Sequence, residues 1–203
     1  MSVRTTEADA STAALPSSKV RRTITWLRVP LVIVGSLLLL NFITDRRLFW
    51  MGVPLVLFGE WLQMWSSAHL YKNQDFTTSG PYTYVRNPMY IGRFFLVLGF
   101  FVMTGNVPLI IAYIVLYAPY AQVRVKREEG RLAKIFEPHY QHYCSEVPRW
   151  LPKLRPYSRA EARRWNWTQM CINNEHLNLI GVLVILVIVY LRIEMLPRSL
   201  WNF

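Results

Sequence analysis

Five apolar segments of the chain approach the length that a bilayer requires of a helix, and they constrain the fold more than any other feature. A helix that rises 1.5 Å per residue needs roughly 17 to 25 apolar residues to cross the hydrocarbon core. The segments cover residues 26–43, 48–66, 88–104, 107–123 and 177–193. We therefore predict an all-α fold, a polytopic membrane bundle of about five transmembrane helices.

Short connections restrict how these segments are arranged. Only Gly105 and Asn106 separate the third segment from the fourth, so the two must form a tight antiparallel hairpin. Residues 44–47 join the first segment to the second almost as tightly. The second segment carries Glu60 and Gln63, which leaves a second interpretation open: this helix is buried at a protein–protein seam instead of spanning the bilayer.

The basic residues predict the orientation of the bundle. The chain has 23 Lys and Arg residues, and a cytoplasmic N-terminus would place 18 of them inside and four outside, with Arg93 within the third segment. This distribution follows the positive-inside rule. We therefore expect an integral protein of a bacterial inner membrane or of the endoplasmic reticulum, with its N-terminus and active site cytoplasmic. Basic loops also hold anionic membrane lipids, so the net charge of +11 requires no nucleic-acid partner.

Composition bounds the domain organisation. Hydrophobic residues make up 53% of the chain, which is more than a soluble domain usually has. Residues 1–20 are rich in Ser, Thr and Ala without periodicity, so we expect a disordered tail and no signal peptide. Residues 21–203 are predicted to form a single transmembrane domain, with a catalytic core at 67–155 and an additional C-terminal helix at 177–193. The two cysteines have no partners at metal-ligand spacing, so no metal site is expected.

One motif lies just before the third apolar segment. Gly80-Pro81 is a strong turn signal, and Asn87-Pro88 is typical of a helix N-cap followed by proline at the first helical position. The N-terminus of that helix, beside Arg86, would offer unpaired N–H groups to a carboxylate or a phosphate. The sequence therefore predicts an anion-binding point at the inner membrane surface.

Two glycines follow in the same segment. Gly92 and Gly99 lie one heptad apart on one helix face, where they allow a neighbouring helix or a ligand to approach closely. A capped helix with a small-residue packing face would explain both glycines, together with Asn87 and Pro88, without any function.

The hairpin geometry brings a second motif, Glu128-Glu129, toward the first. The fourth segment returns to the depth of Pro88, and Glu128 then lies roughly 8 Å beyond that level. Adjacent residues of a helix point about 100° apart, so we expect one carboxylate to contact ligand and the other to pair with a basic neighbour. The local candidates are Arg124 and Arg131 for Glu128, and Lys126 for Glu129. The alternative is that both glutamates lie on a solvent-exposed helix face and form salt bridges there.

The stretch from His69 to about Pro152 resembles the membrane-embedded methyltransferases typified by isoprenylcysteine carboxyl methyltransferase and the phospholipid N-methyltransferases. The residues that carry the resemblance are Gly80-Pro81-Tyr82, Val85-Arg86-Asn87-Pro88-Met89-Tyr90, Gly92, Glu128-Glu129, Leu132, Phe136, Tyr140, Tyr143 and Val147-Pro148. The resemblance implies S-adenosylmethionine as methyl donor, held at a cofactor site on the cytoplasmic face. It also implies a lipophilic acceptor that enters from the bilayer.

The resemblance suggests a role for each motif residue. Arg86, Asn87 and Glu128 are the expected catalytic residues. The cofactor-binding residues would be His69, Tyr82, Tyr84, Arg86, Pro88, Tyr90, Gly92, Glu128 and Glu129. Within this set, a glutamate would bind the amino group of the cofactor and Arg86 would bind a carboxylate. The tyrosines would form the walls of the pocket. His69 would act as a base or a cofactor contact.

The acceptor is the less defined part of the prediction. The isoprenylcysteine enzymes carry histidine where this chain has Asn87, whereas the segment after Phe136 is more similar to those same enzymes. Our preferred function is carboxyl O-methylation of an isoprenylcysteine-like substrate, and phospholipid N-methylation is the alternative. Two other classes stay open, a membrane sterol-type NADPH reductase and a non-catalytic lipid-binding protein. The C-terminal helix would wall the lipid entrance or form the seam of a homo-oligomer.

Overall fold

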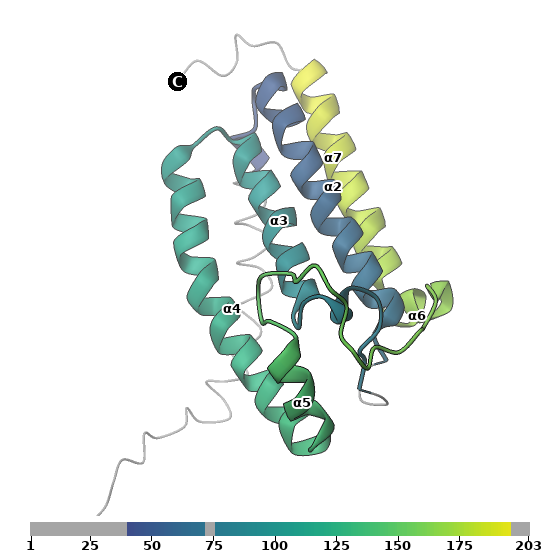
Figure 1. Cartoon of the computed structure of the whole chain (residues 1–203). Coiled ribbons are helices and arrows are strands. Elements are labelled where there is room, and N and C mark those ends of the chain that lie inside the picture. Colours follow the sequence, from purple (N-terminus) through teal and green to yellow (C-terminus); the bar gives the residue numbers. More distant parts are fainter. Residues whose placement is uncertain (1–39, 72–75, 196–203) are drawn as a thin grey trace, which may run out of the picture. The chain divides into compact units, whose positions relative to one another are not determined.

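Four long helices run side by side and form the body of the structure (Figure 1). The computed structural model describes residues 40–71 and 76–195, which belong to one structural unit. The predicted tail at 1–20 and nearly all of the first predicted span, 26–43, lie outside the described residues. Within the described part the secondary structure consists of six α-helices and one short 3-10 helix, so the all-α prediction is confirmed there.

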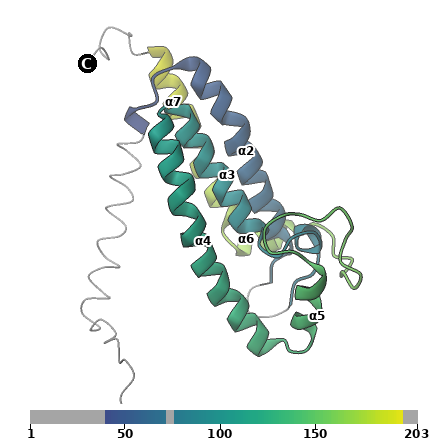
Figure 2. The same cartoon turned by 60° about the vertical axis from the view of Figure 1, so that its left-hand side comes forward.

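The long helices are α2 (Arg46–His69), α3 (Pro88–Met103), α4 (Val107–Ile135) and α7 (Glu175–Met195). Helix α2 lies between α7 and α3, and α4 packs on the far side of α3 (Figures 1 and 2). The 3-10 helix η1 (Gly80–Thr83), α5 (His139–Glu146) and α6 (Trp167–Ile172) gather with the loops at one end of the bundle. The functional residues predicted from the sequence lie at this end.

The helix positions agree with the four apolar segments that fall in the described part. The hairpin between α3 and α4 is as tight as predicted, because Gly105 adopts a positive φ of 65° and the Asn106 side chain accepts a hydrogen bond from Leu109 N at 3.1 Å. Helix α4 then continues well past residue 123, the predicted end of the span. Among the described helices, α4 and α7 are long and apolar enough to cross a bilayer, and α3 is a shorter apolar helix. The count of five spans stays a prediction.

Small residues let α2 and α3 approach closely. A Cβ atom on Gly92 would lie 2.8 Å from the carbonyl oxygen of Gly59, and a Cβ atom on Gly99 would lie 2.8 Å from the carbonyl oxygen of Gly52. The expected close approach of a neighbouring helix at Gly92 and Gly99 is therefore confirmed. Gly52 and Gly59 repeat the same heptad spacing on the partner helix.

The apolar core lies where α2, α3 and α7 meet. Its buried side chains are Ile43, Phe49, Val56, Phe100, Met103, Val182, Leu186 and Val189. The polar residues of α2, Glu60 and Gln63, are also buried, at 1% and 5% exposure. The described helices therefore cover both side chains without a second protein. The α3–α4 hairpin packs against this core, and its open end lies toward η1 and α5.

Candidate functional site

The loop before α3 is shaped by a glycine and a histidine. Gly80 has a positive φ of 59°, and a Cβ atom there would meet the His69 ring at 2.5 Å, so this turn accepts only glycine. His69 is buried, with its Nδ1 3.2 Å from Ser79 Oγ. Burial, and then the charge of Arg163, lower the pKa of His69 below its ordinary value. The predicted turn is confirmed, and His69 packs behind it.

The segment that follows α5 is hydrogen-bonded to this loop through backbone groups. Its backbone contacts are Arg86 N to Pro148 O at 2.9 Å, Lys153 N to Tyr84 O at 3.0 Å, and Tyr157 N to Thr83 O at 2.9 Å. The Tyr143 hydroxyl donates to Tyr82 O at 2.7 Å. Residues more than 60 positions apart in the chain thus form one floor, which positions Arg86 and Asn87 against α4.

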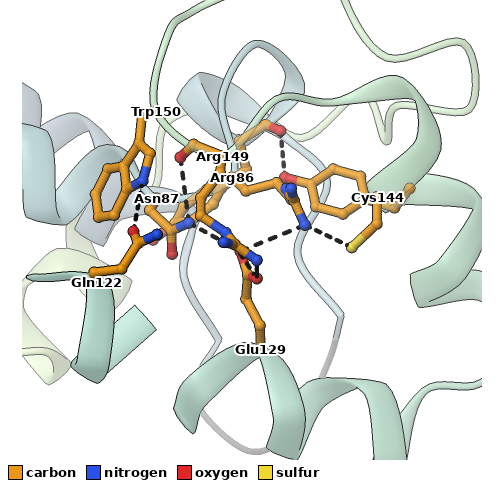
Figure 3. Close-up of polar contacts among 9 residues, drawn as sticks. Arg86, Asn87, Gln122, Glu129, Cys144, Arg149 and Trp150 are labelled. Carbon is orange, nitrogen blue, oxygen red and sulfur yellow. Dashed lines mark hydrogen bonds and ion pairs between the residues drawn. The ribbon is translucent and has the colours of Figure 1, made fainter. Parts of the chain in front are cut away.

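Glu129 of α4 is the centre of a buried ion-pair network (Figure 3). Arg149 donates from Nε to both carboxylate oxygens at 3.1 and 3.0 Å, and from Nη2 to Oε2 at 2.5 Å. Arg86 Nη1 lies 3.4 Å from Oε1, and Asn87 Nδ2 donates to the same oxygen at 3.2 Å. Two guanidinium groups and an amide therefore compensate one carboxylate, as a buried charge requires.

One local expectation was wrong at this network, the Lys126–Glu129 pair, and the Asn87 N-cap before Pro88 was confirmed in position but not in its side-chain hydrogen bond. Lys126 does not pair with Glu129, because Glu129 shares the inward face of α4 with Ala121 and Val125 whereas Lys126 is exposed. Asn87 occupies the N-cap position of α3, but its side chain makes no cap hydrogen bond. It donates instead to Glu129 and to the carbonyl oxygen of Arg149 at 3.3 Å.

Glu128 has a different environment. Its side chain is exposed and faces the ring of Tyr90 at the start of α3. The two predicted partners, Arg124 and Arg131, form no ion pair with Glu128 within 4 Å among the described residues, and Arg124 is hydrogen-bonded to Tyr120. As the 100° offset predicts, the two carboxylates have different surroundings: Glu129 pairs with Arg86 and Arg149, and Glu128 lies beside Tyr90. That Glu128 contacts a ligand stays a prediction.

A polar cavity of about 390 Å³ opens between the loop, the start of α3, the second half of α4 and α5. Seven of the predicted site residues line it, namely Tyr82, Arg86, Asn87, Pro88, Tyr90, Glu128 and Glu129. Three others do not. Tyr84 contributes its carbonyl to the floor, Gly92 packs against Gln63 and Gly59, and His69 lies behind the turn.

Several wall residues were not in the predicted set. Arg93 and Arg131 add positive charge to the cavity, and Phe76, Phe136 and Tyr140 add aromatic surface. Arg149, which positions Glu129, was also missed, although it directly follows Val147-Pro148. Burial raises the pKa of Tyr82 and of Tyr143 well above the ordinary value, so both phenols stay protonated donors.

The polar groups of the cavity are suited to a ligand that carries both charges. Arg86 Nε is buried without a hydrogen-bond partner, and its Nη1 contacts Cys144 Sγ at 2.9 Å. The Glu128 carboxylate also lines the cavity, beside Tyr90. No group of His, Cys, Asp and Glu side chains that could hold a metal ion occurs among the described residues.

A second, apolar cavity of about 480 Å³ lies between α3 and α4. It is lined by Tyr90, Ile91, Phe94, Tyr117, Ala118, Pro119, Ala121, Gln122 and Trp150. Trp150 Nε1 donates to Gln122 Oε1 at 3.0 Å at one end of it (Figure 3). Tyr90 lines both cavities, so the polar and the apolar site share one wall.

Comparison with known proteins gives one family and two relatives. The profile of the family described as phospholipid methyltransferase matches residues 48–139, from α2 to the start of α5. Protein-S-isoprenylcysteine O-methyltransferase of Schizosaccharomyces pombe is 36% identical over 86 residues, which are 41% of this chain and 36% of that protein. The cobalt-zinc-cadmium resistance protein CzcN of Cupriavidus metallidurans is 29% identical over 108 residues, 53% of this chain and 47% of that protein.

The matched region contains the two sequence motifs, and it ends before Arg149. The chain spans less than half the length of either of these curated relatives. No solved structure matches it.

Proposed function

We propose, on the premise that the chain belongs to the family of phospholipid and isoprenylcysteine carboxyl methyltransferases, that it is a membrane-embedded, S-adenosylmethionine-dependent methyltransferase. Its acceptor is lipophilic, and its preferred reaction is O-methylation of the carboxylate of an isoprenylcysteine-like substrate. The observation that carries the proposal is the cavity in which the segment Tyr82–Tyr90 meets Glu128 and Glu129. Both relatives match parts of the chain only, so activity and acceptor are proposals.

The residues of the cavity fit S-adenosylmethionine, which carries a carboxylate, an ammonium group and an aromatic base. The unpartnered Nε of Arg86 would donate a hydrogen bond to the carboxylate, and Glu128 would accept one from the ammonium group. Phe76, Phe136 and Tyr140 offer aromatic surface for the base. Glu129 and Arg149 do not need to touch the ligand, because their ion pair holds Arg86 and Asn87 in place.

When bound, S-adenosylmethionine supplies a methyl carbon that takes a lone pair from the acceptor while the carbon–sulfur bond breaks, leaving a neutral thioether. The work of the protein is then positioning and electrostatics. Tyr90 stands between the polar cavity and the apolar one, and the reacting atoms would meet beside it.

The choice of a carboxylate acceptor follows from the shortage of bases on the cavity wall. A carboxylate is already ionised and needs no base, whereas an ammonium acceptor must first lose a proton. Glu129 is occupied by Arg86 and Arg149, and His69 does not line the cavity. The alternative, phospholipid N-methylation, is favoured by the name of the matched family, and Glu128 would then be the base.

We further propose a bundle of about five spans, with the cavity at the cytoplasmic face. The apolar helices α4 and α7 support a membrane location, and the distribution of Lys and Arg supports the orientation. Membrane lipids are then the direct surroundings of the exposed apolar residues on α4 and α7, and a homo-oligomer stays compatible with the same surface.

Ligand-induced stabilisation tests the function class. The purified full chain is melted in detergent with S-adenosylhomocysteine or with NADPH. A ligand at 100 times its dissociation constant stabilises by roughly 2.7 kcal/mol. We expect a rise with S-adenosylhomocysteine only. A rise with NADPH alone would favour the reductase class, and a rise with neither would favour the lipid-binding class.

The acceptor is tested by the chemistry of the product. Membranes that contain the chain are incubated with methyl-labelled S-adenosylmethionine and then treated with alkali. A methyl ester releases its label as volatile methanol, and an N-methyl product keeps it. Label that survives alkali would sink the carboxyl proposal and favour phospholipid N-methylation.

A further inference from the structure

Arg93 lines the polar cavity, but the binding of S-adenosylmethionine proposed above gives it no role. It lies in the apolar helix α3, one turn after Tyr90, within a predicted span. No acidic side chain pairs with it anywhere in the described ranges, 40–71 and 76–195. Ionisable residues inside membrane segments usually mark a binding or transport function. Arg93 is exposed and contacts the ring of Tyr90, so its guanidinium group can reach a bound anion.

Arg93 lies at the junction of the two cavities. Its guanidinium carbon lies 5.7 Å from the centre of the Tyr90 ring, and its side chain lines the polar cavity. Tyr90 is the wall that this cavity shares with the apolar one. A positive charge therefore stands where the polar site ends and the apolar site begins.

The apolar cavity has the features of a site for a hydrocarbon chain. Its lining is almost entirely apolar or aromatic, and its volume of about 480 Å³ falls in the range of small-molecule sites. Ala118 and Pro119 on its wall are exposed, so the cavity opens at the surface between α3 and α4. Trp150 and Gln122, which are hydrogen-bonded to each other, add polar groups to this lining.

We propose that Arg93 and the α3–α4 cavity form the acceptor subsite, in which Arg93 binds the anionic carboxylate or phosphate of an amphiphile and the cavity holds its hydrocarbon chain. This inference rests on the proposed function, because it names the acceptor class of the same site. Arg93 is then the residue that selects anionic over neutral amphiphiles.

Matched acid and ester probes test the role of Arg93. The purified full chain, in phosphatidylcholine nanodiscs, binds labelled N-acetyl-S-farnesylcysteine or its methyl ester, with empty nanodiscs as the blank. We expect the acid to bind about tenfold more tightly than the ester, since a charge-assisted pair is lost with the charge. Arg93→Gln should bring this ratio to about one while the ester binds as before, and Arg93→Lys should keep part of the preference.

The same variants test whether Arg93 only contacts the surface of the bilayer. A long basic side chain near a helix end also reaches the phosphates of the bilayer. If Arg93 did only that, Arg93→Gln would leave the ratio of acid to ester unchanged, and the proposal would be overturned. Dodecyl phosphate distinguishes the two anions: binding of the phosphate about tenfold tighter than the carboxylate keeps the subsite and overturns carboxyl methylation.

The part of the subsite that binds the hydrocarbon chain has its own test. Ala118→Trp should fill the cavity and weaken both farnesyl probes, whereas Ala112→Trp, on an exposed part of the same helix outside the cavity, should change neither. Equal affinities in the two variants would overturn the placement of the chain. Melting curves of both variants show that each is folded.

The subsite and the methyltransferase function can fail separately. S-adenosylhomocysteine is added to the same wild-type samples. If it gives no stabilisation while the acid preference depends on Arg93, the methyltransferase proposal fails and the subsite holds. If it stabilises the protein while Arg93→Gln keeps the preference, the subsite fails alone.

Discussion

Arg149 holds Glu129 with two guanidinium nitrogens, Nε at 3.0 Å and Nη2 at 2.5 Å from the same carboxylate oxygen. Hydrogen bonding to Glu129 also raises the pKa of Arg149 above its ordinary value. The pair joins the segment after α5 to α4, and it turns Glu129 toward Arg86 and Asn87. The site thus depends on a residue outside both sequence motifs.

Arg149→Met should destabilise the protein by about 1–2 kcal/mol. Breaking a fully buried pair costs about 3–5 kcal/mol, but the Arg149 side chain is 35% exposed, so solvent screening reduces the effect. Thermal unfolding in detergent measures the difference. Arg155→Met, an exposed arginine of the same segment, is the control and should be neutral. Equal melting temperatures for the two variants would refute the role of Arg149.

The two adjacent glutamates should respond differently to neutralisation. Glu128→Gln should lower the affinity for S-adenosylhomocysteine about 10- to 100-fold, the cost of one charged hydrogen bond, with little change in stability. Glu129→Gln should lower the melting temperature as well, because Arg86 and Arg149 lose their shared partner. Isothermal titration and thermal melts separate the two effects.

Glu137→Gln is the control for both glutamates, since Glu137 is an exposed carboxylate near the end of α4. Wild-type affinity in both Glu128→Gln and Glu129→Gln would contradict the assignment of the glutamates to the site.

Gly92→Ala should destabilise the bundle by about 1–3 kcal/mol through overpacking. The added Cβ atom would lie 2.8 Å from Gly59 O, so α2 and α3 must move apart. Gly181→Ala is the matched control in α7, where a Cβ atom meets nothing within 4 Å. It should leave stability unchanged or raise it by up to about 1 kcal/mol. Chemical unfolding of both variants checks the contrast.

His69 should make the protein less stable in mild acid. Its pKa in the folded state is lowered, chiefly by burial, so the unfolded state binds its proton first. Stability is then complete above the unfolded-state pKa of about 6.5 and declines as the pH falls below it. His69→Gln should flatten this decline in melts between about pH 7 and pH 5. His139→Gln, at an exposed position, should keep it. A decline of the same size in both variants would exclude His69 as its source.

Hydropathy and turn signals were sufficient to predict the four long helices of the described part, but not α5 and α6. The apolar runs at 88–104 and 107–123, separated by Gly105-Asn106, placed the α3–α4 hairpin correctly, and its geometry brought Glu128 and Glu129 to the right end. The heptad spacing of Gly92 and Gly99 predicted a close helix contact. Gly52 and Gly59 on the partner helix have the same spacing, so the sequence carries this signal on both sides of the contact.

The partners inside the site could not be predicted from local spacing. Helical i,i+3 spacing predicted that Lys126 pairs with Glu129. In the structure Glu129 lies on the inward face of α4 and pairs with Arg149, 20 residues further along the chain. Arg149 lies in a segment without periodicity, so only the folded backbone brings it there. Asn87 occupies the predicted N-cap position, but its Oδ1 accepts no cap hydrogen bond and its Nδ2 donates to the buried Glu129 carboxylate, a contact that the residue type alone does not predict.

The central claim is that this chain transfers a methyl group from S-adenosylmethionine to a lipid-soluble acceptor at the Arg86–Glu128 cavity. The most direct measurement is the label that enters the lipid-soluble fraction when membranes containing the wild type or Arg86→Gln receive methyl-labelled S-adenosylmethionine. We predict incorporation with the wild type and at least a tenfold loss with Arg86→Gln at equal protein levels, since a charged contact at the reacting site is removed. Equal incorporation in the two membranes, or none above membranes that lack the chain, would contradict the claim.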